Sequence, residues 1–368
     1  MVRLLLTSDI HLGRAERASR IPESARTTTF RRICALARDH DMLLVAGDLF
    51  DGCGPSRELV QIVAEEFKAL RELNIAIVYA PGEREILEDG TIPAFLSQIN
   101  PSHLFSGAPG TGTFFFTRNG QDVYVYGFPA ARQSEIAAIA RIEKEGFHLG
   151  LFHADFGAGD EAGASAHVLQ RNDIRSLGLD FYAMGHNHQF QLFKYRNRII
   201  GAYPGSPEAV ESDEEGNRYV LSISVVNNEI HQIKRFEVNS LKIATLQFNC
   251  GTITSSSPVL DALDKHKSPK TAMLLVLEGE RGFHLDIREI RACAHDFFSL
   301  EIEDRSVPTM EILIGEYAGE NSLRGELFAL LKERIAEKGL PPEIDARRFI
   351  HALHVIARQG RYEPEAWL

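Results

Sequence analysis

The first 150 residues alternate short apolar runs with longer stretches of helical periodicity, and this alternation constrains the fold more than any other feature. Helices are predicted at 25–38 and from Pro55 to about residue 73, because proline is favoured in the first turn of a helix. Strands are predicted at 4–7, 42–46, 75–80, 122–128, 147–152 and 181–184. Apolar strands that alternate with helices indicate an α/β fold with buried, largely parallel strands.

After Gly185 the pattern changes to closely spaced strands with short turns, which indicates antiparallel pairing. These strands are predicted at 191–195, 198–202, 218–226 and 229–236. A chain of 368 residues exceeds the ~100–200 residues of one domain, so we predict two domains, at 1–237 and 238–368.

The second domain is predicted to be smaller and of the α+β class. The small, polar segment 250–258 reads as a loop or linker. Its predicted elements are strands at 273–278 and 309–315 and helices at 286–296, 322–338 and 345–358. The helix at 322–338 has an apolar stripe formed by Leu323, Leu327, Leu330, Leu331 and Ile335.

Composition and charge exclude several classes of protein. The chain has 40 Lys+Arg against 51 Asp+Glu, a net charge of −11, which argues against a protein that coats nucleic acid but still permits a local basic groove. Its four cysteines form no CxxC pair, so neither a disulfide framework nor a zinc ribbon is expected. No apolar run reaches the ~18–20 residues of a membrane span, and Asp9 and His11 interrupt the N-terminal one. We therefore expect a cytoplasmic protein without a membrane partner.

Acidic residues and histidines follow the predicted strands in a fixed order. Asp9 and His11 stand in DIHLG, Asp48 and Asp51 in GDLFD, His153 in GLFHAD, and His186 and His188 in GHNH. Taken singly, each motif is weak, since a strand-end histidine or a capping aspartate is common. Together they lie at the carboxyl edge of a sheet, where α/β folds build their sites.

Mixed imidazoles and carboxylates suit manganese, iron, zinc or nickel better than calcium or magnesium. A shared carboxylate can bridge two such ions about 3.5–4 Å apart, and the pair clamps a phosphate and lowers the pKa of a water. The sequence thus predicts a site for two divalent metal ions, with manganese as the first expectation.

The ordered motifs resemble the calcineurin-like metallophosphoesterase superfamily over residues 3–190. SDIHLG, GDLFD and the YPGSP at 203–207 resemble the SbcD-type exonuclease subunit of double-strand-break repair. The resemblance implies a layered sandwich of two sheets flanked by helices, with a smaller α+β cap at the C-terminus. It also implies ligand roles: Asp9, His11 and His188 for one metal, Asp48 as the bridge, His153 and His186 for the other, and Asp51 orienting neighbouring ligands.

One motif departs from that family, which carries G-N-H-D where this chain has Gly82-Glu83-Arg84-Glu85. Glu83 offers an oxygen in place of the asparagine that binds the second metal. Arg84 replaces the histidine that meets the scissile phosphate; arginine can clamp a phosphate but cannot supply a proton near neutral pH. The candidate catalytic residues are Arg84 and Asp51, and the alternative is a polar turn in an inactive relative.

The segment 14–32 is rich in arginine, with only Glu16 and Glu23 opposing. Its basic residues are Arg14, Arg17, Arg20, Arg26, Arg31 and Arg32. Arg14, Arg17 and Arg20 are candidates for contact with a DNA backbone, which binds largely through charge neutralisation. A solvated loop and helix face is the alternative.

These features favour a metal-dependent DNA exo- or endonuclease. The alternatives are a phosphodiesterase or phosphatase for small molecules, and a DNA-binding assembly subunit that does not cleave. DNA is the expected partner, the resemblance implies an SbcC-like coiled-coil ATPase, and a homodimer is left open.

Overall fold

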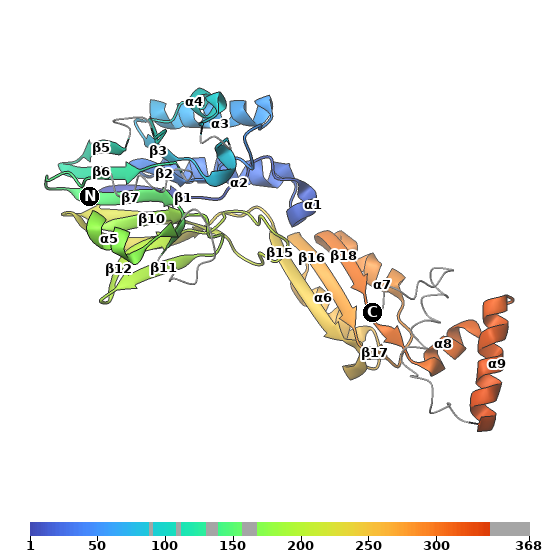
Figure 1. Cartoon of the computed structure of the whole chain (residues 1–368). Coiled ribbons are helices and arrows are strands. Elements are labelled where there is room, and N and C mark those ends of the chain that lie inside the picture. Colours follow the sequence, from blue (N-terminus) through green and yellow to red (C-terminus); the bar gives the residue numbers. More distant parts are fainter. Residues whose placement is uncertain (88–90, 108–111, 130–138, 157–167, 339–368) are drawn as a thin grey trace. The chain divides into compact units, whose positions relative to one another are not determined.

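The computed structural model describes the chain except for residues 88–90, 108–111, 130–138, 157–167 and 339–368 (Figure 1). It divides into two compact units, Met1–Lys242 and Ile243–Leu368. The sequence predicts this division after residue 237, slightly earlier than the structure places it. Among the described residues, no helix is both long and apolar enough to span a membrane.

The first unit contains two six-stranded mixed sheets. The first sheet has the order β14 (Glu229–Glu237), β13 (Tyr219–Val226), β1 (Val2–Thr7), β2 (Met42–Ala46), β3 (Ala76–Ala80) and β4 (His103–Leu104). Strands β1 to β4 are parallel, whereas β13 and β14 add an antiparallel hairpin at one edge.

The second sheet is built in the same way. Its order is β11 (Gln191–Tyr195), β12 (Arg198–Tyr203), β10 (Phe181–Gly185), β7 (Phe147–His153), β6 (Gln121–Gly127) and β5 (Thr113–Arg118). The four central strands are parallel, and β11 and β5 pair antiparallel at the two edges. Each sheet therefore presents several carboxyl ends at one edge.

Helices cover the outer faces of the two sheets (Figure 1). The first sheet packs on α2 (Glu23–Ala37), α3 (Arg57–Glu72) and α4 (Ala94–Gln98), and the second on α5 (Arg171–Leu177). Shorter elements of this unit are α1 (Glu16–Ser19), η1 (Glu83–Glu85), β8 (Asp155–Phe156) and β9 (Val168–Leu169). An apolar core lies between the sheets, with Leu4, Leu6 and Val78 packing in one cluster with Val125 and Leu149. Strands buried on both faces explain the nearly continuous apolar runs in the sequence.

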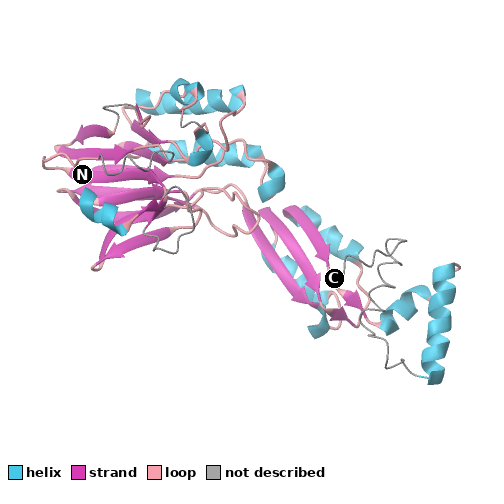
Figure 2. Cartoon of the chain, viewed as in Figure 1, coloured by secondary structure: helices cyan, strands magenta, loops and turns pink. Residues whose placement is uncertain are grey.

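The second unit combines strands and helices (Figure 2). Its sheet has the order β15 (Lys242–Asn249), β16 (Ser268–Glu278) and β18 (Phe297–Asp304), and β17 (Glu280–Arg281) pairs with β19 (Val307–Pro308). The helical elements are η3 (Cys250–Thr252), α6 (Ser257–His266), α7 (Ile287–Ala292), η4 (Cys293–Asp296), α8 (Met310–Tyr317) and α9 (Leu323–Lys338).

The α/β sandwich of two sheets flanked by helices is confirmed, and two local predictions fail. The strand predicted at 309–315 is wrong, because Thr309 precedes helix α8, which buries Met310 and Leu313 one helical turn apart. The segment 250–258 is not a plain loop, since it holds η3 and the start of α6. The sequence prediction also omits edge strand β5. The helix predicted at 345–358 lies outside the described residues.

Candidate metal centre

The motif residues are carried by the ends of parallel strands from both sheets. Asp9 and His11 follow β1, Asp48 and Asp51 follow β2, and η1 follows β3. From the second sheet, His153 ends β7, and His186 and His188 follow β10. Because the carboxyl ends of these strands share one edge of the sandwich, residues far apart in the sequence meet there.

Two groups of donor atoms form at this edge. One comprises Asp9, His11 and His188 and the other Asp9, Asp48 and His153, each with ligand atoms within 4.8 Å of one another. The family resemblance implies Asp48 as the bridge, whereas Asp9 is the residue common to both groups. The Oδ2 atom of Asp48 lies 3.7 Å from His11 Nε2 and 3.6 Å from His153 Nε2. The Asp9 carboxylate therefore belongs to both groups, and the Asp48 carboxylate lies close to a histidine of each.

Three of the histidines are oriented through their Nδ1 atoms. His11 Nδ1 lies 2.9 Å from Asp51 Oδ1, His153 Nδ1 lies 2.9 Å from the Ala46 carbonyl, and His188 Nδ1 lies 2.6 Å from Glu214 Oε1. A carbonyl oxygen accepts only, so His153 donates from Nδ1, and in the neutral ring with this tautomer Nε2 carries the free lone pair. Carbonyl and carboxylate partners of this kind hold metal-ligating histidines in the required tautomer.

The donor set fits a pair of divalent cations. Within the described part of the chain, the Nε2 atoms of His11 and His153 are buried and have no hydrogen-bond partner. Such orphaned atoms are rare and point to an ion or another group that occupies the space beside them. Burial, and then the neighbouring charge of Asp9, hold the pKa of Asp48 well above its usual range. Burial lowers the pKa of His11, which favours the neutral imidazole that a metal requires.

The backbone at this edge is strained. Asp9, His11, Asp48 and His186 all have positive φ angles, of 52°, 51°, 49° and 96°. Non-glycine residues rarely adopt this region, and they persist there only where the surrounding structure imposes it. At one of these positions the backbone itself contacts the site, because the His186 N–H donates to the Asp9 carboxylate at 3.1 Å.

His186 lies beside the two donor groups and belongs to neither. Its ring centroid is 5.3 Å from that of His153, and its Nε2 atom is 3.8 Å from Asp155 Oδ2. The role that the family resemblance implies for His186, as a ligand of the second metal, therefore stays a prediction. Asp155, two residues beyond the β7 histidine, is an acidic neighbour that the sequence prediction does not include.

The three altered residues of the Gly82–Glu85 segment occupy different surroundings. Glu83 is exposed, and its charge helps to raise the pKa of Asp48. Arg84 faces the site: its Nε atom lies 3.9 Å from Asp48 Oδ2, its Nη1 atom lies 3.6 Å from Asp51 Oδ1, and its side chain is 41% exposed. Arg84 is therefore close to the donor groups and still reaches solvent.

Glu85 is fully buried and has a structural role. It accepts hydrogen bonds from the Phe50 N–H at 2.8 Å, from the Gly82 N–H at 2.9 Å and from the Tyr79 hydroxyl. Burial and the nearby Asp48 raise the pKa of Glu85 to about 7. Its longer side chain thus connects the β2 and β3 loops behind the donor groups.

Glu214 is a site residue that the sequence prediction misses. Besides His188, it accepts hydrogen bonds from Ser206 Oγ at 2.7 Å and from Arg218. Burial would raise the pKa of Glu214, but His188 and Arg218 lower it to about 2. The only signal in the sequence is the run of acidic residues after YPGSP, which no spacing rule connects to GHNH.

Several arginines of segment 14–32 have partners within the protein. Arg14 contacts Asp51 and Glu211, and Arg32 donates to the carbonyls of Val238 and Asn239 at 3.2 and 2.8 Å. Arg31 lies 3.8 Å from Glu66, and Arg26 is completely buried. Arg17 is exposed, and Arg20 is partly exposed. The segment is therefore not a continuous row of exposed cations.

Two stacked mixed sheets gather carboxylates and imidazoles at one edge, which is an arrangement suited to divalent metal ions. A model of the calcineurin-like phosphoesterase family matches residues 2–190, just over half of the chain. The chain belongs to this family, whose members are metal-dependent hydrolases that bind two divalent metal ions.

Two curated relatives are similar to the chain over about half of their own length. The uncharacterized metallophosphoesterase YhaO of Bacillus subtilis is 28% identical over 217 residues, which cover 58% of this chain and 52% of YhaO. The DNA double-strand break repair protein Mre11 of Methanopyrus kandleri is 25% identical over 237 residues, covering 58% and 51%.

A solved structure is also similar, described as a candidate 5′-nucleotidase from Staphylococcus aureus in complex with alpha-ketoglutarate. The similarity has a TM-score of 0.43 and 14% identity, and covers 64% of this chain and 54% of that one. The fold of this chain is assigned from its two sheets and from the family match.

Proposed function

We propose that this protein is a metal-dependent phosphodiesterase that acts on DNA, as an SbcD-like exo- or endonuclease. The observation that carries the proposal is the position of Arg84, whose guanidinium lies 3.9 Å from a buried carboxylate of the donor groups and is 41% exposed. A cation at the mouth of a metal centre is suited to bind the phosphate of a substrate.

The proposed roles follow from the contacts. Asp9, Asp48, His11, His153 and His188 would hold the metal ions, which we propose to be manganese. Two such ions supply Lewis acidity and a nucleophile at neutral pH. Asp51 fixes the His11 ring through the 2.9 Å contact at Nδ1. Arg84 clamps the phosphate, but an arginine guanidinium keeps its proton near neutral pH and cannot protonate a leaving group.

The choice of DNA rests on the resemblance to SbcD-type nucleases and on the similarity to a protein named for DNA double-strand break repair. The Arg14 side chain is only 13% exposed, so the proposed contacts with the DNA backbone rest on the exposed Arg17 and Arg84 and the partly exposed Arg20. Hydrolysis of a small phosphodiester is the second candidate, and the small number of exposed arginines in segment 14–32 favours it.

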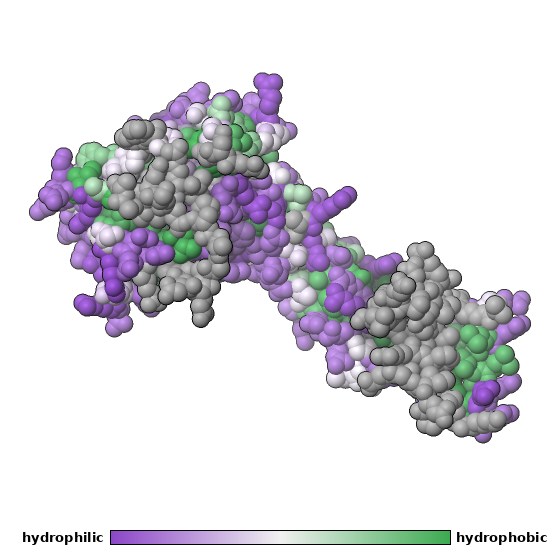
Figure 3. Space-filling view, in the orientation of Figure 1, coloured by the Kyte–Doolittle hydropathy of each residue, from purple (hydrophilic) through white to green (hydrophobic). Residues whose placement is uncertain are grey.

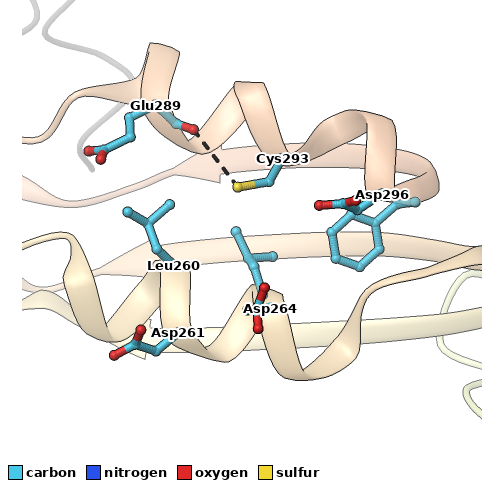
Figure 4. Close-up of a pocket in the computed structure, with 8 residues that line it drawn as sticks. Leu260, Asp261, Asp264, Glu289, Cys293 and Asp296 are labelled. Carbon is cyan, nitrogen blue, oxygen red and sulfur yellow. Dashed lines mark hydrogen bonds between the residues drawn. The ribbon is translucent and has the colours of Figure 1, made fainter.

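One pocket of the second unit is acidic. A pocket of about 360 Å³ lies between α6 and the α7–η4 segment (Figure 4). Its lining includes the four carboxylates of Asp261, Asp264, Glu289 and Asp296. Negative charge repels a nucleic-acid backbone. A DNA contact by this unit would therefore lie on another of its faces.

A partner protein and the cellular location remain part of the proposal. Helix α9 exposes Leu327 and Leu330, which are 42% and 64% exposed, and hydrophobic atoms gather over this helix in Figure 3. We propose this surface for an SbcC-like coiled-coil ATPase, in a cytoplasmic complex.

The test compares two substrates with different leaving groups, linear duplex DNA and bis-p-nitrophenyl phosphate, with and without manganese. The phenolate of the second substrate leaves without a proton, whereas the alkoxide of DNA needs one. We expect slow cleavage of DNA and faster cleavage of the phenyl ester. A Glu83→Asn/Arg84→His double variant should cleave DNA about 10²–10⁴-fold faster, the usual contribution of a general acid.

Glu85 is left unchanged in this variant because its three buried hydrogen bonds are structural. Arg84→Lys is the matched control, since it keeps the charge but loses the fork of donors. Rapid cleavage of DNA by the wild-type protein, with no gain in the double variant, would show that another group donates the proton. Absence of cleavage of either substrate would favour the non-catalytic alternative.

A further inference from the structure

Arg14 lies directly behind the first motif and has two carboxylate partners. Its backbone N–H donates to the His11 carbonyl at 3.1 Å. Its Nη1 atom lies 3.3 Å from Asp51 Oδ1, and its Nη2 donates to Glu211 Oε1. The Arg14 side chain is only 13% exposed. The guanidinium is thus held between Asp51, near the β2 end, and Glu211, which follows the YPGSP segment.

The same Oδ1 atom of Asp51 also contacts the His11 ring. Asp51 Oδ1 lies 2.9 Å from His11 Nδ1, and the Nε2 atom on the other side of that ring faces Asp48 at 3.7 Å. A chain of contacts therefore runs from Glu211 through Arg14 and Asp51 to His11. Fixing the carboxylate from two directions fixes the plane and the tautomer of the imidazole.

We infer that Arg14 and Glu211 are positioning residues of the metal centre, which hold Asp51 so that His11 presents its Nε2 atom to the first metal ion. This inference rests on the metal binding in the proposed function and not on the substrate. It also assigns Arg14 a role other than contact with DNA.

Arginine suits this position because its planar fork can reach two carboxylates at once, which a lysine ammonium cannot do with the same geometry. The arrangement also affects Arg84, whose Nη1 atom lies 3.6 Å from the same Asp51 oxygen. With Arg14 already paired to Asp51, Arg84 can move to a phosphate without leaving that carboxylate unpaired. The two arginines thereby have separate tasks.

The experiment measures Mn²⁺ binding to the metal-free full-length protein by isothermal titration calorimetry. It follows the histidine ring nitrogens by ¹⁵N NMR in the metal-free protein. Arg14→Ala should weaken binding of one of the two ions about 10–100-fold, the usual effect of losing a partner behind a metal ligand. It should also remove the signal of a His11 ring protonated at Nδ1 alone. Glu211→Gln should show the same changes to a smaller extent, because it leaves the Arg14–Asp51 pair in place.

Arg17→Ala is the matched control, because this exposed arginine lies three residues along the same segment. It should leave both measurements unchanged. Metal affinity and a His11 tautomer in Arg14→Ala equal to those of the wild type would overturn the inference. If Arg14→Ala fails to fold, Arg14→Lys decides: weakened binding supports the role of the fork, and wild-type binding contradicts it. A wild-type protein that binds metal but cleaves no DNA refutes the proposed substrate alone.

Discussion

The Asp9 and Asp48 side chains show what the metal centre requires of single residues. Both are buried, at 0% and 3% exposure, and the charge of Asp9 disfavours ionisation of Asp48. Two carboxylates kept together out of water destabilise the metal-free fold, and cations that bind between them relieve the repulsion. The site therefore reduces the free energy of unfolding until metal binds.

The repulsion between Asp9 and Asp48 predicts opposite effects of Asp48→Asn on stability and on metal binding. The amide keeps an acceptor for the backbone N–H of Arg84, whose nitrogen lies 3.3 Å from Asp48 Oδ1, but it removes the negative charge. The metal-free variant should be more stable than the metal-free wild type by about 1–3 kcal/mol. It should lose most of the rise in melting temperature that Mn²⁺ gives to the wild type. Thermal melts with and without Mn²⁺ test both statements; an unchanged metal-induced rise would contradict the assignment of Asp48.

Glu214 offers a second prediction at this scale. Glu214→Gln should weaken metal binding about 10–100-fold, because an amide orients the His188 ring less strongly than a carboxylate. It should also destabilise the fold, since buried Arg218 loses its charged partner. Glu215→Gln is the control, because the neighbouring Glu215 is exposed. Equal Mn²⁺ affinities of the two variants would show that Glu214 does not support metal binding.

The sequence could predict the residues that follow strands but not the residues behind them. His153 and His188 stand out because each ends or follows an apolar run. Glu214 lies 26 residues from His188, in a loop without periodicity, so only the folded chain brings it there. The positive φ of Asp9 and Asp48 likewise has no signal in the sequence, because glycine is the residue usually expected in that conformation.

At the scale of elements, the central strands were predictable because strands buried on both faces leave long apolar runs. The predicted strand at 42–46 matches β2, and the failures come from weaker signals. Thr309 to Gly315 is a short apolar run, which periodicity alone cannot assign to a strand or a helix. Edge strand β5 could have been found from Asn119-Gly120, which joins it to β6 and has φ angles of 52° and 71°.

The contact between the two sheets at the metal centre depends on a glycine. A Cβ atom on Gly185, at the end of β10, would lie 1.7 Å from the Ala46 carbonyl oxygen at the end of β2. That carbonyl also accepts the hydrogen bond from His153 Nδ1. Only a residue without a side chain permits this approach.

We therefore predict that Gly185→Ala separates the two sheets locally. It should destabilise the fold by about 3 kcal/mol, through overpacking and the loss of a buried hydrogen bond, and weaken Mn²⁺ binding. Gly54→Ala is the control, because its Cβ would meet nothing within 4 Å. Urea denaturation measures the difference. A Gly185→Ala variant as stable as Gly54→Ala would show that the sheets can move apart without cost.

At the scale of the whole molecule, residues 238–241 complete the first unit. The Ser240 and Leu241 backbone N–H groups donate to the buried Glu208 carboxylate at 2.7 and 3.3 Å, and Thr29 of α2 donates to the same carboxylate at 2.5 Å. Val238 packs in the core between α2 and the first sheet. Residues 240 and 241 are thus hydrogen-bonded to Glu208, in the loop that also carries Glu211 and Glu214.

These contacts predict that two fragments differing by five residues have different stabilities. The fragment 1–242 contains all the candidate metal ligands and should unfold cooperatively and bind Mn²⁺ as the full chain does. The fragment 1–237 leaves Arg32 and Glu208 without the partners they have at 238–241. Because buried polar groups without partners cost about 1–3 kcal/mol each, it should be at least about 3 kcal/mol less stable. For a unit of this size that lowers the melting temperature by about 6–12 °C.

Calorimetry of the two fragments tests this prediction. Equal melting temperatures would mean that residues 238–241 belong to the second unit, and a fragment 1–242 that fails to fold would mean that the first unit requires the second.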